Sequence, residues 1–167
     1  VLATPPSVAA NLLPDMPLPA EGEPILNLHY KVPGLQVPAD WPVPMLGLVS
    51  SLAQWVFVRD GLASVTVSAA RDLPTKDHDK LARMIWQEIR PYLGEETKEL
   101  PPYKLIQEKR ATFTQTPDNV AKRPPSDIGI SNLRLAGDWT DTGLPATIEG
   151  AVRSGRLAAH SFMAANL

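Results

Sequence analysis

The clearest pattern in the chain is an alternation of apolar and polar side chains over residues 25–32. Every second position from Leu26 to Val32 is large and apolar, whereas Asn27 and His29 lie on the opposite face. This period of two predicts a β-strand with one face in a core and the other toward solvent or a polar partner.

Three more segments have the character of strands. They are residues 54–59, 62–69 and 103–114, and the dipeptide Asp60-Gly61 suits the tight turn of a hairpin between the first two. Strands joined by such a turn pair in antiparallel fashion. The middle of the chain is therefore expected to form an antiparallel or mixed sheet.

Two segments before the C-terminal region have helical periodicity. Residues 77–92 predict an amphipathic helix across the sheet, with Thr75 as N-cap and Gly94 as terminator. Its apolar stripe is expected to consist of Leu81, Met84, Ile85, Ile89 and Tyr92. A short helix is predicted at residues 7–13, with Ser7 as its N-cap.

The last part of the chain predicts a strand, a loop and a helix. Residues 132–136 form the expected strand, Gly137 and Asp138 end it, and Pro145 suits the first position of a helix that continues to about residue 164. The expected apolar stripe of this helix consists of Ile148, Val152, Gly155, Ala159, Phe162 and Met163.

The start of this helix is a candidate binding site. Unpaired N–H groups near Ala146, Thr147 and Ile148, together with the helix dipole, favour partial negative charge on a ligand. Asp138 is placed to accept a hydrogen bond from a ligand hydroxyl group. A purely structural role, with a turn-capping aspartate and a closely packed helix, fits the same spacing.

Composition narrows the range of functions. The 18 prolines fix several connections, among them residues 116–127, and the net charge of −2 with scattered basic residues argues against a nucleic-acid surface. There is no cysteine, and no group of histidines and carboxylates has metal-ligand spacing, so no metal site is expected. Nothing in the sequence approaches the ~20 apolar residues of a membrane-spanning helix.

The most specific signal is the segment from Leu135 to Gly155, LAGDWTDTGLPATIEGAVRSG. It resembles the C-terminal flavin motif of the squalene-associated FAD-dependent desaturases, which belong to the amine oxidase and phytoene desaturase superfamily. Residues 1–6, 53–57 and 108–113 also resemble this family, in the same order. The resemblance covers essentially the whole chain.

The resemblance implies an α+β or α/β fold, as the C-terminal fragment of a two-domain FAD-dependent protein similar to amine oxidases. Residues 1–23 would end a segment of the FAD domain and form a linker, and residues 24–116 would belong to the substrate domain. Residues 117–130 would be a second linker, and residues 131–167 the final strand–loop–helix of the FAD domain. The sequence contains no strand followed by G-x-G-x-x-G, so the phosphate-binding turn is expected upstream of Val1.

The implied activity is that of an FAD-dependent oxidoreductase acting on a C30 isoprenoid. The family members that resemble this sequence most are hydroxysqualene dehydroxylases, which give squalene for hopanoid synthesis. A phytoene-type carotenoid desaturase, or another flavoenzyme of the superfamily, is the first alternative, because the motif does not separate removal of hydrogen from removal of hydroxide. A non-enzymatic lipid-binding domain is the second alternative.

Candidate site residues come from the motif and from the first strand. His29 and Asn27 are candidate catalytic residues for the departing hydroxyl group, and the alternative is that both simply face solvent. The residues expected to bind FAD are Gly137, Asp138, Trp139, Pro145, Ala146, Thr147 and Ile148. For Trp139 and Thr140, contact with the flavin edge and simple packing both remain open.

The expected partners are an isoprenoid lipid substrate and an N-terminal half of the same protein. A fragment would expose apolar surface, so we also expect a homodimer, poor binding of FAD and no activity by the chain alone. The first residues lack the charged start of a signal peptide, and a cytoplasmic location is expected. Peripheral contact with the inner face of a bacterial membrane is expected because the substrate would partition there.

Overall fold

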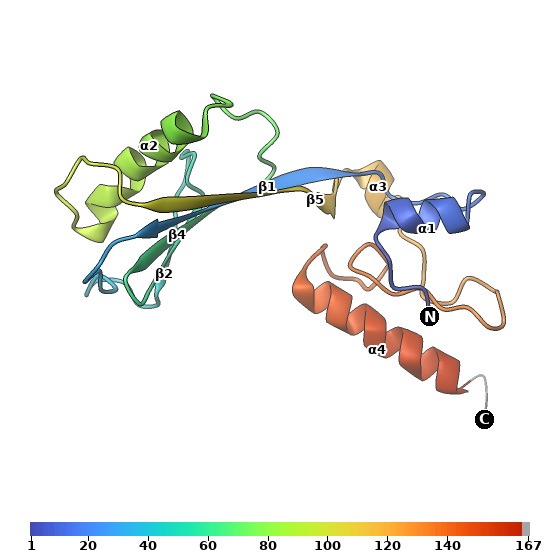
Figure 1. Cartoon of the computed structure of the whole chain (residues 1–167). Helices are drawn as coiled ribbons and strands as arrows, with labels where there is room; N and C mark the ends of the chain where they lie inside the picture. Colours follow the sequence, from blue (N-terminus) through green and yellow to red (C-terminus); the bar gives the residue numbers. More distant parts are fainter. Residues whose placement is uncertain (165–167) are drawn as a thin grey trace. The chain divides into compact units, whose positions relative to one another are not determined.

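The computed structural model describes residues 1–164, apart from the side chain of Glu21 (Figure 1). The described chain divides into two compact units. Unit 1 comprises residues 1–22 and those from 112 onward, and unit 2 comprises residues 23–111. Each unit has its own hydrophobic core.

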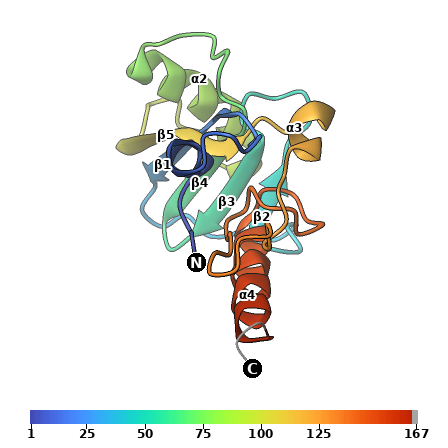
Figure 2. The same ribbon diagram turned by 90° about the vertical axis from the view of Figure 1, so that its right-hand side faces the viewer.

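Unit 2 is built on a five-stranded sheet with the strand order β2-β3-β4-β1-β5 (Figure 2). The strands are β1 (Glu21–Lys31), β2 (Met45–Gly47), β3 (Trp55–Arg59), β4 (Leu62–Val67) and β5 (Tyr103–Phe113). The pairs β1–β4, β2–β3 and β3–β4 are antiparallel. The α+β class and the antiparallel form of the expected sheet are confirmed, whereas the short strand β2 was not predicted.

The hairpin between β3 and β4 has the predicted turn. Asp60 and Gly61 have φ values of +49° and +73°, the left-handed pair that a two-residue turn of this kind requires. β4 ends at Val67, earlier than the predicted Ala69, whose φ of +50° lies outside the strand region.

One face of the sheet is covered by the helix α2 (His78–Ile89), which continues as the 3₁₀ helix η1 (Arg90–Leu93). Gly94 ends this segment in the left-handed conformation, as predicted. Thr75 was wrong as the N-cap, because Asp77 takes that position and its carboxylate accepts a hydrogen bond from the Lys80 amide. The Thr75 hydroxyl instead accepts from the amide of Asp77.

The buried face of α2 differs in part from the predicted stripe. Met84 and Tyr92 are 40% and 50% exposed, whereas Ala82 and Trp86 are buried. At 100° per residue Met84 lies far round the helix from Ile85 and Ile89, and the tighter 3₁₀ turn moves Tyr92 off the α-helical face.

The described residues of unit 1 form three helices, α1 (Pro6–Leu12), α3 (Pro117–Ala121) and α4 (Ile148–Ala164). Ser7 was wrong as the N-cap of the first helix, because Pro5 occupies the cap position and a proline also fills the first turn. The predicted connection over residues 116–127 contains α3, where the Thr116 hydroxyl accepts from the Asn119 amide. This segment packs within unit 1.

The strand predicted at residues 132–136 is reduced to a single parallel bridge between Leu2 and Leu135. Leu2 donates to the carbonyl oxygen of Arg134 at 2.7 Å and accepts from the amide of Ala136 at 3.0 Å. On its other side Leu135 bonds to Ser126, whose carbonyl oxygen accepts and whose hydroxyl donates. The loop that contains Ser126 thus occupies the edge of Leu135 along which a second strand would otherwise pair.

Candidate functional site

Gly137, Trp139 and Thr140 form a fixed turn at the start of the loop that leads to α4. The indole of Trp139 is buried, and its Nε1–H donates to the carbonyl oxygen of Thr4 at 2.8 Å. A Cβ at Gly137, where φ is +152°, would lie 2.4 Å from that nitrogen, so only glycine fits beneath the ring. Thr140 is also buried and donates from its hydroxyl to the Gly137 carbonyl oxygen at 2.9 Å. The structure places both side chains inside unit 1.

Ser154 connects α4 to this turn. Its hydroxyl accepts a hydrogen bond from the Gly137 amide at 2.8 Å and donates to the carbonyl oxygen of Ala151 at 2.6 Å. The side chain is 1% exposed. The orientation of the helix relative to the turn is therefore fixed by a buried polar contact.

The helix begins three residues later than predicted, at Ile148, and Pro145 precedes it instead of occupying its first position. The amide of Ala146 donates weakly to Gln115 Oε1 at 3.5 Å. Among residues 1–164, no acceptor is bonded to the amide groups of Thr147, Ile148 and Glu149. These three groups are available to a ligand, whereas the sequence predicted free amide groups at Ala146, Thr147 and Ile148.

The buried face of α4 consists of small residues. Gly150, Ser154 and Ala158, spaced by four, lie against unit 1, and a Cβ at Gly150 would lie 2.7 Å from the Pro145 carbonyl oxygen. The predicted apolar stripe is exposed instead; its members Ile148 and Val152 are 87% and 45% exposed. The buried face is formed by small residues because the close approach at Pro145 leaves no room for larger side chains.

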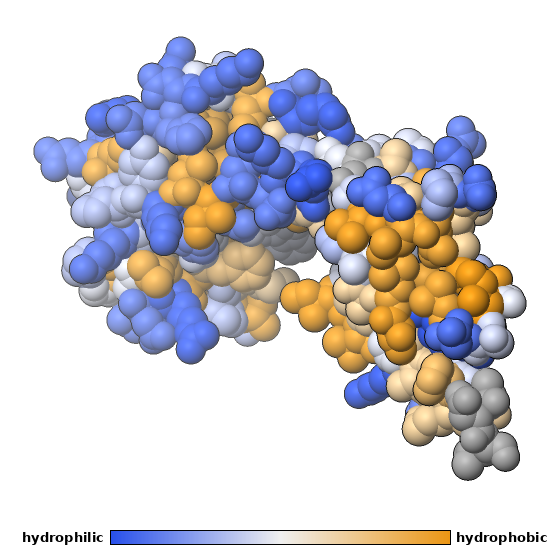
Figure 3. Space-filling view, turned by 45° about the vertical axis from the view of Figure 1, so that its right-hand side comes forward, coloured by the Kyte–Doolittle hydropathy of each residue, from blue (hydrophilic) through white to orange (hydrophobic). Residues whose placement is uncertain are grey.

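Exposed apolar side chains are a general feature of unit 1. The exposed large hydrophobic residues of this unit include Val8, Leu12, Ile148, Val152, Leu157 and Met163. Figure 3 shows hydrophobic residues gathered on the surface of the part that carries the C-terminal helix. The exposed apolar surface expected from the sequence is present, whereas a homodimer stays a prediction.

Asp138 lies half-buried beside the start of the loop. Burial raises the pKa of its carboxyl group above the usual range, whereas hydrogen bonds from its own amide and from that of Trp139, and the charge of Arg123, act in the opposite direction. The carboxylate forms no ion pair with another described residue. It can therefore accept a further hydrogen bond from a ligand.

Arg123 was not predicted as a residue of this site. Its guanidinium group donates to carbonyl oxygens at both ends of the loop, that of Asp138 at 3.1 Å and that of Leu144 at 2.7 Å. It lies 5.6 Å from the ring centre of Phe113. Long-range contacts from a side chain to the backbone leave no periodic signal in a sequence, so no pattern marked this arginine.

In unit 2, the two candidate catalytic residues lie on the face of the sheet opposite α2. His29 Nδ1 is 2.9 Å from Ser64 Oγ, and the hydroxyl of Thr66 donates to Asn27 Oδ1 at 2.8 Å. Ser64 and Thr66 lie directly across from His29 and Asn27 on the neighbouring strand. Both candidates are therefore paired across the strands and half-buried.

The rows of side chains that run across the strands through His29 and Asn27 continue into apolar side chains on β3 and β2. Phe57 lies opposite Ser64 and is followed by Met45, and Trp55 lies opposite Thr66. Met45, Trp55 and Phe57 are 42%, 42% and 39% exposed. We call this surface, formed by His29, Asn27, Ser64, Thr66, Phe57, Trp55 and Met45, the open sheet face. It is polar along β1 and β4 and apolar along β3 and β2.

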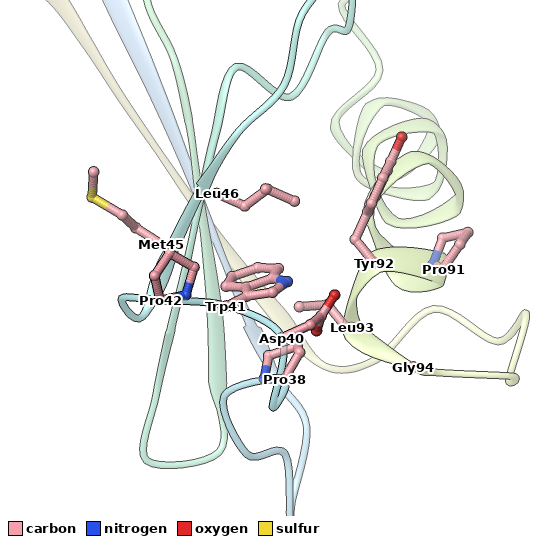
Figure 4. A pocket seen from close by; sticks show the side chains of 10 residues that line it. All are labelled: Pro38, Asp40, Trp41, Pro42, Met45, Leu46, Pro91, Tyr92, Leu93 and Gly94. Atoms are coloured by element: carbon pink, nitrogen blue, oxygen red, sulfur yellow. The ribbon is translucent and has the colours of Figure 1, made fainter.

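A separate pocket of about 590 Å³ lies in unit 2 between the loop at residues 38–42 and η1 (Figure 4). Trp41, Met45, Leu46 and Leu93 are among the residues that line it. Asp40 is the one carboxylate among its lining residues. The pocket is large enough for part of an apolar ligand, but it contains none of the candidate catalytic residues.

Two kinds of site are not found in the described chain. Within residues 1–164, no three His, Asp or Glu side chains lie together in a way that would hold a metal ion. Over the same residues, no helix combines the length and the hydropathy needed to cross a membrane.

Comparison with known proteins relates both units to flavoenzymes. The family model described as flavin containing amine oxidoreductase matches residues 55–161. A hydroxysqualene dehydroxylase of Sinorhizobium fredii is 44% identical over 162 residues, which are 95% of this chain and 37% of that protein. The corresponding protein of Rhodopseudomonas palustris is 43% identical over 99% of this chain and 38% of its own length.

A more distant similarity concerns part of the chain. A 15-cis-phytoene desaturase of Synechococcus elongatus is 34% identical over 73 residues, which are 44% of this chain and 15% of that protein. The chain thus spans 37–38% of the dehydroxylases that it resembles and a smaller part of the desaturase.

Proposed function

This chain belongs to the family of flavin containing amine oxidoreductases, and from that premise we propose that it forms part of an FAD-dependent enzyme that removes the hydroxyl group of hydroxysqualene by reduction. The observation that carries this proposal is the similarity to two hydroxysqualene dehydroxylases over 95% and 99% of the chain. Because the chain spans 37–38% of their length, the activity is proposed for the whole protein.

The residues at the start of α4 fit a flavin. The amide groups of Thr147, Ile148 and Glu149 have no acceptor within the described residues, and the absence of a Cβ at Gly150 keeps the first turn narrow. A flavin ring presents a carbonyl oxygen and a ring nitrogen that gain negative charge on reduction, which amides at the positive end of a helix dipole stabilise. When bound in its reduced form, the flavin would supply the hydride that replaces the hydroxyl group of the substrate and would be left oxidised.

Asp138 provides the proposed site with an acceptor for a hydroxyl group of the cofactor. Its half-buried carboxylate is a suitable acceptor for a ribityl or ribose hydroxyl group. Gly137 and the packed Trp139 fix the backbone on either side of it. We propose that the cofactor is FAD and that it binds within the two-domain fold of the family.

The open sheet face fits the chemistry of an isoprenoid alcohol. Such a molecule has one hydroxyl group on a long apolar chain, and the face combines a polar half at His29 and Asn27 with an apolar half at Trp55 and Phe57. Ser64 bonds to His29 Nδ1 and leaves Nε2 for the substrate. We propose that His29 supplies the proton with which the hydroxyl leaves as water, and that Asn27 orients the hydroxyl group.

Two alternative functions make different use of the same residues. A phytoene-type desaturase would also need the start of α4, and the similarity to the Synechococcus protein over 44% of the chain supports this option less strongly. A lipid-binding domain without cofactor would use the apolar pocket at Trp41 and Leu93. It gives no role to the free amides of α4 or to Asp138.

The test uses the protein expressed from its complete reading frame. We expect a bound-flavin absorbance spectrum and, after anaerobic reduction, conversion of hydroxysqualene to squalene. A protein without flavin would refute the oxidoreductase, and one that only dehydrogenates a polyene would support the desaturase. His29→Gln is expected to lower kcat about 10²-fold with little change in flavin content. Lys31→Ala, on the same side of β1, is the matched control.

A further inference from the structure

Arg123 differs from the other cationic side chains of unit 1 that the structure describes. It forms hydrogen bonds along the whole length of loop 138–144, which belongs to the segment that resembles the flavin motif. Nη1 donates to the Leu144 carbonyl oxygen at 2.7 Å, and Nη2 donates to the carbonyl oxygens of Asp138, at 3.1 Å, and of Thr140. Nη2 also lies 3.5 Å from Thr142 Oγ1. One planar group thus spans residues 138–144.

The arginine is itself held in place. Its guanidinium carbon lies 5.6 Å from the centre of the Phe113 ring, a cation–π distance. Pro124, the next residue, is buried, and its carbonyl oxygen accepts a hydrogen bond from the Asp141 amide at 2.8 Å. The segment from Phe113 to Pro124 therefore bonds to the loop through both a side chain and the backbone.

The contact with Asp138 has a geometric consequence for the carboxylate. In a trans peptide the carbonyl oxygen and the following amide hydrogen point in opposite directions. When Arg123 holds the carbonyl oxygen of Asp138, the amide of Trp139 points away from the guanidinium group. That amide is one of the two backbone groups that donate to the Asp138 carboxylate.

From this geometry we propose that Arg123 is a positioning residue for the flavin: it holds loop 138–144 and, through the Trp139 amide, the Asp138 carboxylate in the arrangement that receives the cofactor. It acts through the loop and does not itself touch the flavin. The inference depends on the proposed flavin site. It assigns to a residue outside the motif the task of ordering the motif before the cofactor binds.

A purely structural arginine provides the matched control. Arg134 is 4% exposed, lies in the same unit and donates to the carbonyl oxygens of Ile130 and Leu133 at 3.1 and 2.7 Å. It has no hydrogen bond to loop 138–144 within the described chain. Arg→Lys at either position keeps the charge but loses the planar, multidentate fork.

The experiment compares Arg123→Lys and Arg134→Lys in the protein from the complete reading frame. Thermal unfolding of the FAD-free forms, the Kd for FAD and the visible circular dichroism of the bound flavin are measured. We expect both variants to unfold at lower temperature than the parent protein. Only Arg123→Lys should weaken FAD binding, by about tenfold or more, and alter the visible circular dichroism.

The other outcomes are decisive. If the parent protein binds FAD and both variants bind it equally well, Arg123 is structural only and the inference is wrong, while the proposed function stands. If the parent protein binds no FAD, the proposed function fails and the inference fails with it. Should Arg123→Lys not fold, Phe113→Leu loosens the guanidinium group more gently and is expected to weaken FAD binding severalfold. Unchanged binding in that variant would also overturn the inference.

Discussion

The first turn of α4 lies close to the loop that precedes it. Substituting alanine for each of two glycines in this helix tests that close approach. A Cβ at Gly150 would lie 2.7 Å from the Pro145 carbonyl oxygen, which belongs to the backbone and cannot rotate away. A Cβ at Gly155 would have nothing within 4 Å. Both residues are helical, so Gly→Ala removes the same backbone entropy at each position.

The magnitudes follow from these distances. At Gly155 the gain should be the full helix propensity difference between glycine and alanine, about 0.5–1 kcal/mol in the free energy of unfolding. At Gly150 the same gain is opposed by overpacking, which costs about 1–3 kcal/mol. We therefore expect Gly155→Ala to stabilise the chain and Gly150→Ala to destabilise it. For a protein of this size about 1 kcal/mol corresponds to roughly 2–4 °C in Tm.

Urea unfolding of the 167-residue chain, followed by circular dichroism at the helix band, measures both free energies. The two variants should differ in sign as well as in size. If Gly150→Ala is stabilised as much as Gly155→Ala, the first turn of α4 does not lie against Pro145. The explanation given for the small-residue face of the helix would then be wrong.

Three further substitutions test other contacts. Burial raises the folded-state pKa of Asp138, so the stability contributed by its protonated form is present at low pH and is lost as pH rises through that pKa. Asp138→Asn should therefore become more stable relative to the parent chain as pH rises. Measurements of Tm against pH check this, and parallel curves for the two proteins would contradict it. Asp77→Ala removes the N-cap of α2 and should cost about 1 kcal/mol in urea unfolding, more than Thr75→Ala. Glu88→Ala leaves the buried Ala53 amide without its acceptor and should cost about 1–3 kcal/mol by the same measurement, whereas an unchanged value would show that water replaces the carboxylate.

The sheet could be predicted from the sequence because its signals are local. The alternation around Leu28 and Tyr30 specifies which side of β1 is buried, and Asp60-Gly61 specifies the turn between β3 and β4. Neither requires knowledge of distant residues. The position of β2 could not be predicted in this way, since three residues are too few to show a period.

The orientation of α4 could not be predicted from its apolar stripe. Periodicity identifies the more hydrophobic side of a helix, but burial also depends on how closely the neighbouring backbone approaches. At Gly150 and Ser154 the approach is so close that small side chains are needed, and Ile148 and Val152 are left on the surface. The spacing of small residues by four was the better indicator here.

The candidate site was predictable to the extent that it is continuous in sequence. Asp138, Thr147 and Ile148 belong to one motif, and the free amides are a property of any helix start. Arg123 lies 15 residues before Asp138, and their contact depends on how the chain returns to the loop. The bond between His29 and Ser64 spans 35 residues and depends on strand register, which the hairpin turn alone did not provide.

The contacts around loop 138–144 indicate that unit 1 orders the proposed site before a ligand is present. Ser154 holds Gly137 from the side of the helix, and Arg123 holds the carbonyl oxygens of Asp138 and Leu144 from the opposite segment. A loop fixed at both ends loses little further entropy when it binds a cofactor, so its free amides and carboxylate contribute more fully to affinity. The buried polar contacts of unit 1 therefore favour the affinity of the proposed site as well as the stability of the fold. Such contacts would have little purpose in a domain that only binds lipid, because an apolar ligand has nothing for an ordered set of amides to recognise.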